Sequence, residues 1–281
     1  MSRLKFLTRK VVCCLQCMSF LLAFLWIGPI NAEVVTLPVR ANITATASWL
    51  PGDASKSPLL ILHGFLQTYN FSTVNHLQEN LADSDYPVLA PTLSLGIDRR
   101  SKMLGCEALH LHNLRQEVEE LKQWVDWLYA RHHKPVVLIA HSAGGKAVTR
   151  YLSLYPDAPI AQTILISFSH LKHLDHQHQP DGKIQSFALG FCKKYLTTEA
   201  YYHSYIDWGS TQMIDAIKHA RHPVSIILGT ADKRILPAWK KSLEEAGINI
   251  VYIDGANHFF DSTHEFDLFD TVEALLGKAG E

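Results

Sequence analysis

The fold is decided by one stretch of sequence, Val136-Val137-Leu138-Ile139-Ala140-His141-Ser142-Ala143-Gly144-Gly145. Its first five residues are all apolar, which is typical of a strand that is buried on both faces of a parallel sheet. A helix-like pattern follows the two glycines and runs to Tyr155. A serine between small residues on such a strand-to-helix turn forms a nucleophile elbow, which exposes the hydroxyl at the end of the strand. The stretch therefore predicts an α/β fold and makes Ser142 the candidate nucleophile.

The turn around Ser142 is too tight for large side chains two positions before and after the serine. Ala140 occupies the first of these positions, where glycine is more common, and Gly144 occupies the second. The helix that follows directs its N-terminus, with the positive end of its dipole, toward the serine. We therefore expect the backbone N–H of Ala143 to stabilise a developing oxyanion.

Other apolar runs alternate with helical patterns along the rest of the chain. Strand-like runs occupy 58–62, 87–90, 163–167, 224–228 and 248–253, and helical patterns occupy 72–82, 109–131 and about 262–276. This alternation indicates a mostly parallel central sheet with helices on both faces. Residues 169–222 show no strand-like run, only helical and aromatic sequence. They predict a helical cap insertion over the C-terminal edge of the sheet, where open α/β sheets bind their ligands.

Two candidate partners for Ser142 follow later strands, in the order acid and then histidine. Asp232 comes directly after the strand at 224–228, and His258 lies on the loop after the final strand. A carboxylate at this edge can fix the tautomer of an imidazole, which then acts as general base toward the serine. Asp254 is the alternative acid, because it is close to His258 in sequence. Three other histidines lie at positions that have another explanation: His63, His141 and His264.

The run His63-Gly64-Phe65-Leu66 follows the strand at 58–62. A glycine at this position lets the backbone approach the site closely, so the N–H of Phe65 is the candidate for a second oxyanion donor. The alternative is an ordinary turn between a strand and a helix.

Taken together, these motifs resemble the α/β-hydrolase superfamily over residues 39–281. The resemblance implies an eight-stranded, mostly parallel sheet, a Ser142–His258–Asp232 triad and no cofactor. A serine nucleophile separates the chain from the dehalogenase and epoxide-hydrolase branches, which use an aspartate at that position. The cap and residues 93–107 match no particular subfamily.

The N-terminal segment 1–32 is typical of a secretory signal peptide. Residues 1–10 include four basic residues and no acid, and residues 11–30 are almost continuously apolar. The segment ends at Ala32, directly before the first acid, Glu33. We expect cleavage after Ala32, although Ile30 is larger than the residue usual at that position. The alternative is an uncleaved anchor, since about 20 apolar residues can just span a bilayer. In both cases we expect the domain at 33–281 to lie outside the cytoplasm. It is expected to be periplasmic or secreted if the segment is a signal peptide, and membrane-anchored if the segment is retained.

Composition excludes several classes of protein. The chain has 281 residues, of which 47% are hydrophobic and 19% charged, so it is not disordered throughout. Its formal net charge of −1 lacks the basic excess of a general nucleic-acid binder. Only residues 11–30 could enter a membrane, which excludes a polytopic membrane protein. The expected partner is a small-molecule or lipid-like acyl substrate, and the sequence does not indicate an oligomeric state.

Only two cysteines, Cys106 and Cys192, lie outside the hydrophobic N-terminal segment. Cys106 follows the strand at 87–90 and Cys192 lies in the insertion, so both are expected at the same edge of the sheet. An exported domain is exposed to oxidising conditions. We therefore predict a Cys106–Cys192 disulfide that attaches the cap to the domain, although two separate thiols are the alternative.

Two groups of residues in the insertion have an open interpretation. Four histidines between residues 170 and 178, with Asp175, could surround a metal, but no recognised ligand pattern is completed and a solvated loop is favoured. No metal site is therefore predicted. The aromatic residues of the insertion could line an acyl or aryl pocket, or pack the cap onto the domain: Phe187, Phe191, Tyr195, Tyr201, Tyr202, Tyr205 and Trp208.

These features together predict an exported serine hydrolase that cleaves carboxylic esters through an acyl-enzyme. The same triad could act on a thioester or an amide, because it does not distinguish acyl leaving groups. The alternative from another class is a catalytically silent binding protein with this fold.

Overall fold

The computed structural model describes residues 32–171 and 182–278. Residues 32–281 form one compact unit by their contacts. Residues 1–31, which make up most of the expected signal peptide, lie outside the described residues. Among the residues described, none of the helices combines the length and the apolar character that a membrane span requires.

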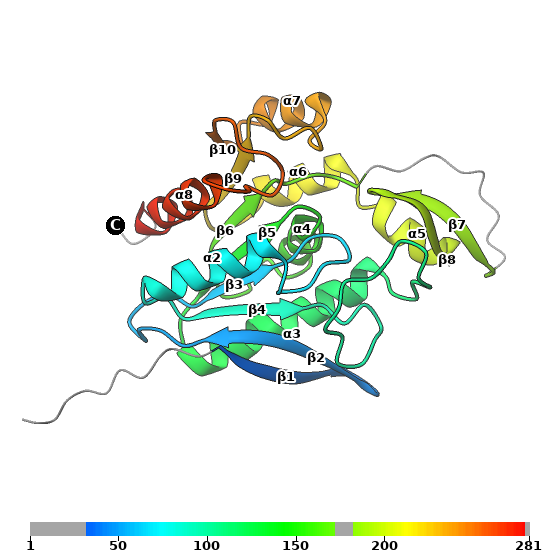
Figure 1. Ribbon diagram of the computed structural model, residues 1–281, viewed down its shortest axis with the longest axis horizontal. Coiled ribbons are helices and arrows are strands. Elements are labelled where there is room, and N and C mark those ends of the chain that lie inside the picture. The colour runs from blue at the N-terminus through cyan, green and yellow to red at the C-terminus, as the bar shows by residue number, and fades with distance from the viewer. Residues whose placement is uncertain (1–31, 172–181, 279–281) are drawn as a thin grey trace, which may run out of the picture. The chain divides into compact units, whose positions relative to one another are not determined.

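The central sheet has eight strands, of which only β2 runs against the others (Figure 1). The order across the sheet is β1 (Glu33–Arg40), β2 (Ile43–Leu50), β4 (Val88–Thr92), β3 (Leu59–Leu62), β5 (Val136–His141), β6 (Ile160–Ile166), β9 (Val224–Gly229) and β10 (Asn249–Ile253). This arrangement confirms the mostly parallel sheet. The sequence patterns did not indicate β1 and β2, because β1 is largely exposed at the sheet edge and β2 contains threonine and alanine in place of a continuous run of large apolar residues.

Helices cover both faces of the sheet, as the alternating pattern predicted (Figure 1). On one face α2 (Ser72–Asp83) and α8 (His264–Lys278) pack together over an apolar cluster that includes Leu81 and Val272. On the other face α3 (Leu114–His132) packs against α4 (Gly144–Leu154) over a second cluster. Helix α7 (Pro237–Glu245) adds Trp239 and Leu243 to this second cluster.

Helix α3 begins five residues later than the apolar periodicity indicated. The Asn113 side chain accepts a hydrogen bond from the Gln116 N–H at 2.9 Å, and the Gln116 side chain accepts one from the Asn113 N–H at 3.3 Å. This reciprocal cap satisfies backbone donors that a helix leaves unpaired, so it fixes the start of α3 at Leu114. Leu111, which lies within the predicted helical range 109–131, is therefore in the preceding loop and is 47% exposed.

The insertion between β6 and β9 is not purely helical, so the expectation that residues 169–222 contain no strand is wrong. Strands β7 (Ile184–Leu189) and β8 (Cys192–Thr198) form an antiparallel hairpin, followed by α5 (Glu199–Ile206) and α6 (Ser210–Lys218). The exposed Lys193 and Lys194 interrupt the apolar pattern of β8, which hid it in the sequence. Helix α6 packs against α4 and serves as the crossover that a parallel β6–β9 pair requires.

The hairpin is attached to the loop that follows β4. Cys106 of this loop and Cys192 of β8 form a disulfide with their Cα atoms 5.3 Å apart, which is the pairing that the sequence predicted. The His110 N–H donates to the Leu196 carbonyl at 2.8 Å, and the Thr197 hydroxyl donates to the His110 carbonyl at 2.6 Å. Covalent and backbone contacts thus fix β8 beside this loop.

Candidate active site

Ser142 lies at the turn between β5 and α4 with a φ of +53°, in the left-handed region that non-glycine residues seldom occupy. Its N–H donates to the Ile166 carbonyl at 2.8 Å, so the turn is attached to β6. A Cβ atom on Gly144 would lie 2.5 Å from the His63 carbonyl oxygen, which explains why glycine is needed there. The local geometry is therefore that of the predicted elbow.

The structure brings Ser142, His258 and Asp232 together. His258 Nε2 lies 2.8 Å from Ser142 Oγ, and His258 Nδ1 lies 2.7 Å from Asp232 Oδ2. Asp232 follows β9 and His258 follows β10, so both side chains reach the C-terminal edge of the sheet where β5 ends. The alternative acid, Asp254, is exposed and accepts a hydrogen bond from Thr230 Oγ1 at 2.9 Å. The carboxylate beside His258 is thus that of Asp232.

Electrostatics favour an ionised Asp232. Burial alone would raise the pKa of this carboxyl, but its interactions with His258 and its other hydrogen bonds together outweigh that effect and lower it. One of these bonds is donated by the backbone N–H of Arg234 to Asp232 Oδ1 at 2.8 Å. An ionised acceptor on Nδ1 leaves Nε2 of the neutral imidazole free to accept the serine proton.

The three alternative histidines have other bonds. His141 Nε2 donates to the His258 carbonyl at 3.0 Å, and burial lowers the pKa of His141 to about 4. His63 Nε2 accepts the N–H of Leu93 at 3.1 Å, and burial lowers the pKa of His63 to about 3. His264 Nδ1 lies 3.0 Å from a carboxylate oxygen of Asp267 on helix α8. Of these, His141 supports the site indirectly, because it holds the backbone of His258.

The two predicted oxyanion donors, the N–H groups of Ala143 and Phe65, belong to two segments that both lie close to Ser142. Ala143 is the N-cap of α4, where backbone N–H groups have no acceptor within the helix. The turn that carries Phe65 passes close to the serine, since a Cβ atom on Gly64 would lie 3.3 Å from Ser142 Cβ. Both N–H groups therefore belong to backbone that lies directly against the candidate nucleophile.

A buried arginine that sequence reasoning missed braces the turn of Phe65. Arg100 is 3% exposed and donates to the carbonyls of Gln67 at 2.6 Å and Leu93 at 2.7 Å. It therefore ties the turn after β3 to the loop after β4. No motif identified it, because a lone arginine in a long loop has the sequence signature of a solvated side chain.

An open cleft of about 500 Å³ gives access to Ser142 and His258. Two cationic side chains, Lys233 and Arg234, line it together with a mostly apolar and aromatic wall that consists of Phe65, Phe71, Met103, Leu171, Phe191 and Phe259. The aromatic residues of the insertion have both of the expected uses. Phe191 at the hairpin tip lines the cleft, 5.6 Å from the Phe65 ring, whereas Phe187, Tyr195 and Tyr202 are buried.

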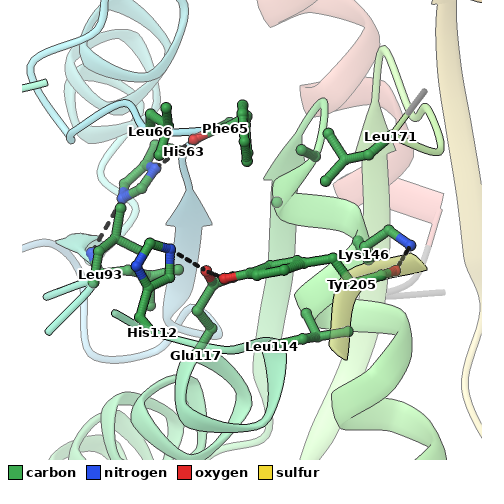
Figure 2. Close-up of a pocket in the computed structure, with 14 residues that line it drawn as sticks. His63, Phe65, Leu66, Leu93, His112, Leu114, Glu117, Lys146, Leu171 and Tyr205 are labelled. Carbon is green, nitrogen blue, oxygen red and sulfur yellow. Dashed lines mark hydrogen bonds and ion pairs between the residues drawn. The ribbon is translucent and has the colours of Figure 1, made fainter. Parts of the chain in front are cut away.

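Phe65 and Ala143 also line a second, smaller cavity (Figure 2), whose volume of about 20 Å³ is enough for about one water molecule. Lys146 Nζ donates to the Tyr205 carbonyl at 2.7 Å and to the Trp208 carbonyl, and the Tyr205 hydroxyl donates to Glu117. Burial raises the pKa of Glu117 to about 7 and lowers that of Lys146 to about 7. These polar side chains of the cavity are therefore hydrogen-bonded within the protein.

No cluster of metal-ligating side chains occurs among residues 32–171 and 182–278. Most of the histidine group at 170–178 lies outside the described residues. Its first member, His170, packs edge-on against Trp239 with ring centroids 5.6 Å apart.

Comparison with known proteins identifies the family by one family model and the fold by solved structures. A family model described as "Alpha/beta hydrolase family" matches residues 59–269. Similar solved structures include Est1E from Butyrivibrio proteoclasticus, with a TM-score of 0.64 and 18% identity over 89% of this chain and 98% of that one. Another is a thioesterase domain from the curacin biosynthetic pathway, with a TM-score of 0.61 and 15% identity over 88% and 99% of the two chains.

A third is the esterase domain of a Rhodothermus marinus protein, with a TM-score of 0.60 and 17% identity over 87% of this chain and 97% of that one. At these identities the structural matches establish the fold alone. No curated protein matches the chain by sequence. The family model covers well over half of the residues, and the sheet, the elbow and the ordered acid and histidine agree with it. The chain therefore belongs to the alpha/beta hydrolase family.

Proposed function

We propose that the protein is a serine hydrolase that cleaves carboxylic esters through an acyl-enzyme. One observation carries the proposal: Ser142, His258 and Asp232 form a continuous hydrogen-bonded chain at an open cleft. This is the arrangement by which a serine hydroxyl becomes a nucleophile.

In the first half of the reaction, Ser142 Oγ attacks the ester carbonyl carbon while His258 Nε2 takes the serine proton. Asp232 keeps the imidazole oriented and stabilises the imidazolium that forms. The carbonyl oxygen becomes an oxyanion, which the N–H groups of Phe65 and Ala143 stabilise. The tetrahedral intermediate then breaks its bond to the alkoxy oxygen, and His258 gives that oxygen the proton so that the alcohol leaves.

In the second half, His258 takes a proton from water as the water oxygen attacks the acyl carbon. The bond to Ser142 Oγ breaks, the carboxylic acid is released, and the serine recovers its proton from His258. Every group that the proposed reaction needs is a side chain or backbone amide of this chain. The reaction as proposed therefore uses no cofactor.

The apolar and aromatic wall of the cleft suits a small-molecule or lipid-like acyl substrate. A thioester or amide substrate is the second candidate, because the same groups serve it and one structurally similar protein is a thioesterase domain. Export remains part of the proposal and rests on the N-terminal sequence; the Cys106–Cys192 disulfide supports it, since disulfides persist in oxidising compartments.

Labelling with a fluorophosphonate tests the proposed nucleophile. We expect the purified domain to be labelled at one site and Ser142→Ala not to be labelled, because the probe reacts with an activated serine. A panel of ester, thioester and amide substrates with a common acyl group then ranks the leaving groups. A folded wild-type domain that is neither labelled nor active would favour a silent binding protein and reject the proposal.

A further inference from the structure

We propose that the cleft selects esters whose leaving alcohol carries an anionic group, and that Lys233 and Arg234 bind this group. The inference rests on the proposed function and specifies its substrate class. It is carried by the charge of the cleft wall, the fixed position of one cation and the side of the reaction centre on which both cations lie.

The charge of the cleft wall is one-sided. Lys233 and Arg234 follow Asp232 directly, both are exposed, and both line the cleft that gives access to Ser142. Of the described residues that line this cleft, none is acidic. Neither side chain has an ion-pair or hydrogen-bond partner in the described part of the chain, whereas Arg115, Lys122, Arg221 and Lys241 each have a carboxylate partner.

The local charge is not a consequence of the overall charge. Without residues 1–32, which contain four basic residues and no acid, the formal net charge changes from −1 to −5. A net acidic domain that leaves two cations unpaired at its reaction cleft has a locally favourable site for an anion.

Arg234 is positioned in advance of binding. Its guanidinium carbon lies 4.7 Å from the centroid of the Phe259 ring, and its backbone N–H is bonded to Asp232 at 2.8 Å. A guanidinium stacked on an aromatic face keeps its planar set of N–H donors available for a carboxylate or a phosphate. Part of the entropy of ordering this long side chain is therefore lost before a ligand arrives, which strengthens binding.

The position of the cations indicates which half of the substrate carries the anion. Phe259 packs edge-on against His258, with ring centroids 5.1 Å apart, so Arg234 lies on the His258 side of the site. In the proposed reaction His258 delivers a proton to the alkoxy oxygen, and the alcohol therefore leaves along this side. An anionic group on the alcohol, either a carboxylate or a phosphoryl group, would meet Lys233 and Arg234.

Two matched esters test the inference on the purified domain: 4-carboxyphenyl acetate and its neutral isostere, 4-carbamoylphenyl acetate. We expect the wild type to prefer the carboxylate by about tenfold in kcat/KM, which corresponds to about 1.4 kcal/mol. The preference should appear mainly in KM and should decrease as NaCl rises from about 50 to about 500 mM, because salt screens exposed charges. A 4-phosphonophenyl acetate arm distinguishes a phosphoryl from a carboxylate preference.

The variant Lys233→Gln/Arg234→Gln should reduce the ratio of the two kcat/KM values to within about twofold of one. The matched control is Lys193→Gln/Lys194→Gln, which removes two exposed cations from β8 that do not line the cleft, and it should keep the wild-type ratio. An acyl-side comparison uses the hemisuccinate and the neutral succinamate of 4-hydroxybenzamide.

Five outcomes decide the matter. Loss of the preference in the cleft variant, together with its retention in the control, supports the inference. Equal wild-type rates for the two acetates overturn it, as does a preference that survives in the cleft variant or one that appears only for the acyl-side anion. A wild type that hydrolyses neither ester and is not labelled by a fluorophosphonate rejects the proposed function itself, which is distinguishable from these results.

Discussion

Phe65 lines two cavities, and the two differ in whether their charged side chains are paired within the protein. The outer cleft of about 500 Å³ exposes Lys233 and Arg234, whose side chains have no ion-pair or hydrogen-bond partner in the described chain. The inner cavity of about 20 Å³ contains Lys146 and Glu117, whose charged groups are bonded to the protein itself (Figure 2).

This difference indicates that the charged side chains of the outer cleft are available to a ligand, whereas those of the inner cavity hold parts of the fold together. Lys146 lies on α4, the helix that follows Ser142. Its two acceptors are the carbonyls of Tyr205, in the last turn of α5, and of Trp208, two residues after that helix. The inner network therefore attaches the insertion to the helix of the elbow. Changes in the outer cleft should alter activity at constant stability, whereas changes to the inner network of Lys146, Glu117 and Tyr205 should alter stability with little effect on chemistry.

The largest effect is expected for Ser142→Ala in the outer cleft. Loss of the nucleophile should lower kcat by about 10⁶-fold on any substrate that the wild type hydrolyses. Serine and alanine both carry a Cβ atom, so the left-handed backbone position at residue 142 is about equally strained in both. The thermal unfolding midpoint of the variant should therefore stay close to that of the wild type. Steady-state kinetics and calorimetry check both statements. Wild-type turnover in the variant would remove Ser142 from the reaction.

The next largest effect is expected for Asp232→Asn. An asparagine cannot hold His258 in the required tautomer, so kcat should fall by about 10⁴-fold. Asp254→Asn is the matched control, because Asp254 is exposed and bonded to Thr230, and it should keep nearly full activity. The reverse pattern of activities would transfer the role of the acid to Asp254.

Strands β3, β5, β6 and β9 could be predicted because nearly every position in them is buried. A strand such as β5 has no exposed position, so its apolar run is visible without any knowledge of its neighbours. The elbow, Asp232 and His258 then follow from the rule that ligand sites lie at the C-terminal ends of such strands. The hairpin β7–β8 is exposed on part of its surface, and its sequence contains no comparable signal.

The inner cavity could not be predicted, because its residues come from separate parts of the chain and have no local pattern. Glu117 lies on an amphipathic helix, where an acid is ordinarily expected to face solvent. Its burial depends on Tyr205, 88 positions away, whose hydroxyl donates to it. The position of Lys233 and Arg234 in the cleft could not be predicted for a similar reason. In the sequence, an unpaired cation beside a reaction centre looks the same as one on an ordinary surface, and only the folded structure distinguishes them.

Removal of the disulfide is expected to have an intermediate effect. The same variant tests whether the β7–β8 hairpin controls access to the outer cleft. The variant Cys106→Ser/Cys192→Ser should lower the free energy of unfolding by about 2–4 kcal/mol, since the bond closes a loop across 86 positions. The hairpin tip carries Phe191, so loosening it should raise KM more than it lowers kcat. Urea unfolding and steady-state kinetics provide the measurements. A fall in kcat at constant KM would assign the bond a different role.

The smallest effect is expected for Glu117→Gln in the inner cavity. Burial raises the pKa of Glu117 from 4.5 to about 7, so between these two pH values the folded chain binds more protons at this site than the unfolded chain. The contribution of Glu117 to the free energy of unfolding therefore falls as pH rises through this window. The glutamine has no such dependence and can still accept the Tyr205 hydroxyl.

The stability of Glu117→Gln relative to the wild type should thus increase from pH 4.5 to 7 and then level off, with a total gain of about 1–3 kcal/mol. Urea unfolding at several pH values measures this difference. The control is Glu119→Gln on the same helix, an exposed acid paired with Arg115, which should change stability by less than about 0.5 kcal/mol. Because Glu117 contacts no reacting atom, kcat/KM should stay within a few-fold of the wild type. A large loss of activity at unchanged stability would instead show that the inner cavity takes part in the reaction, and the proposed difference between the two cavities would be wrong.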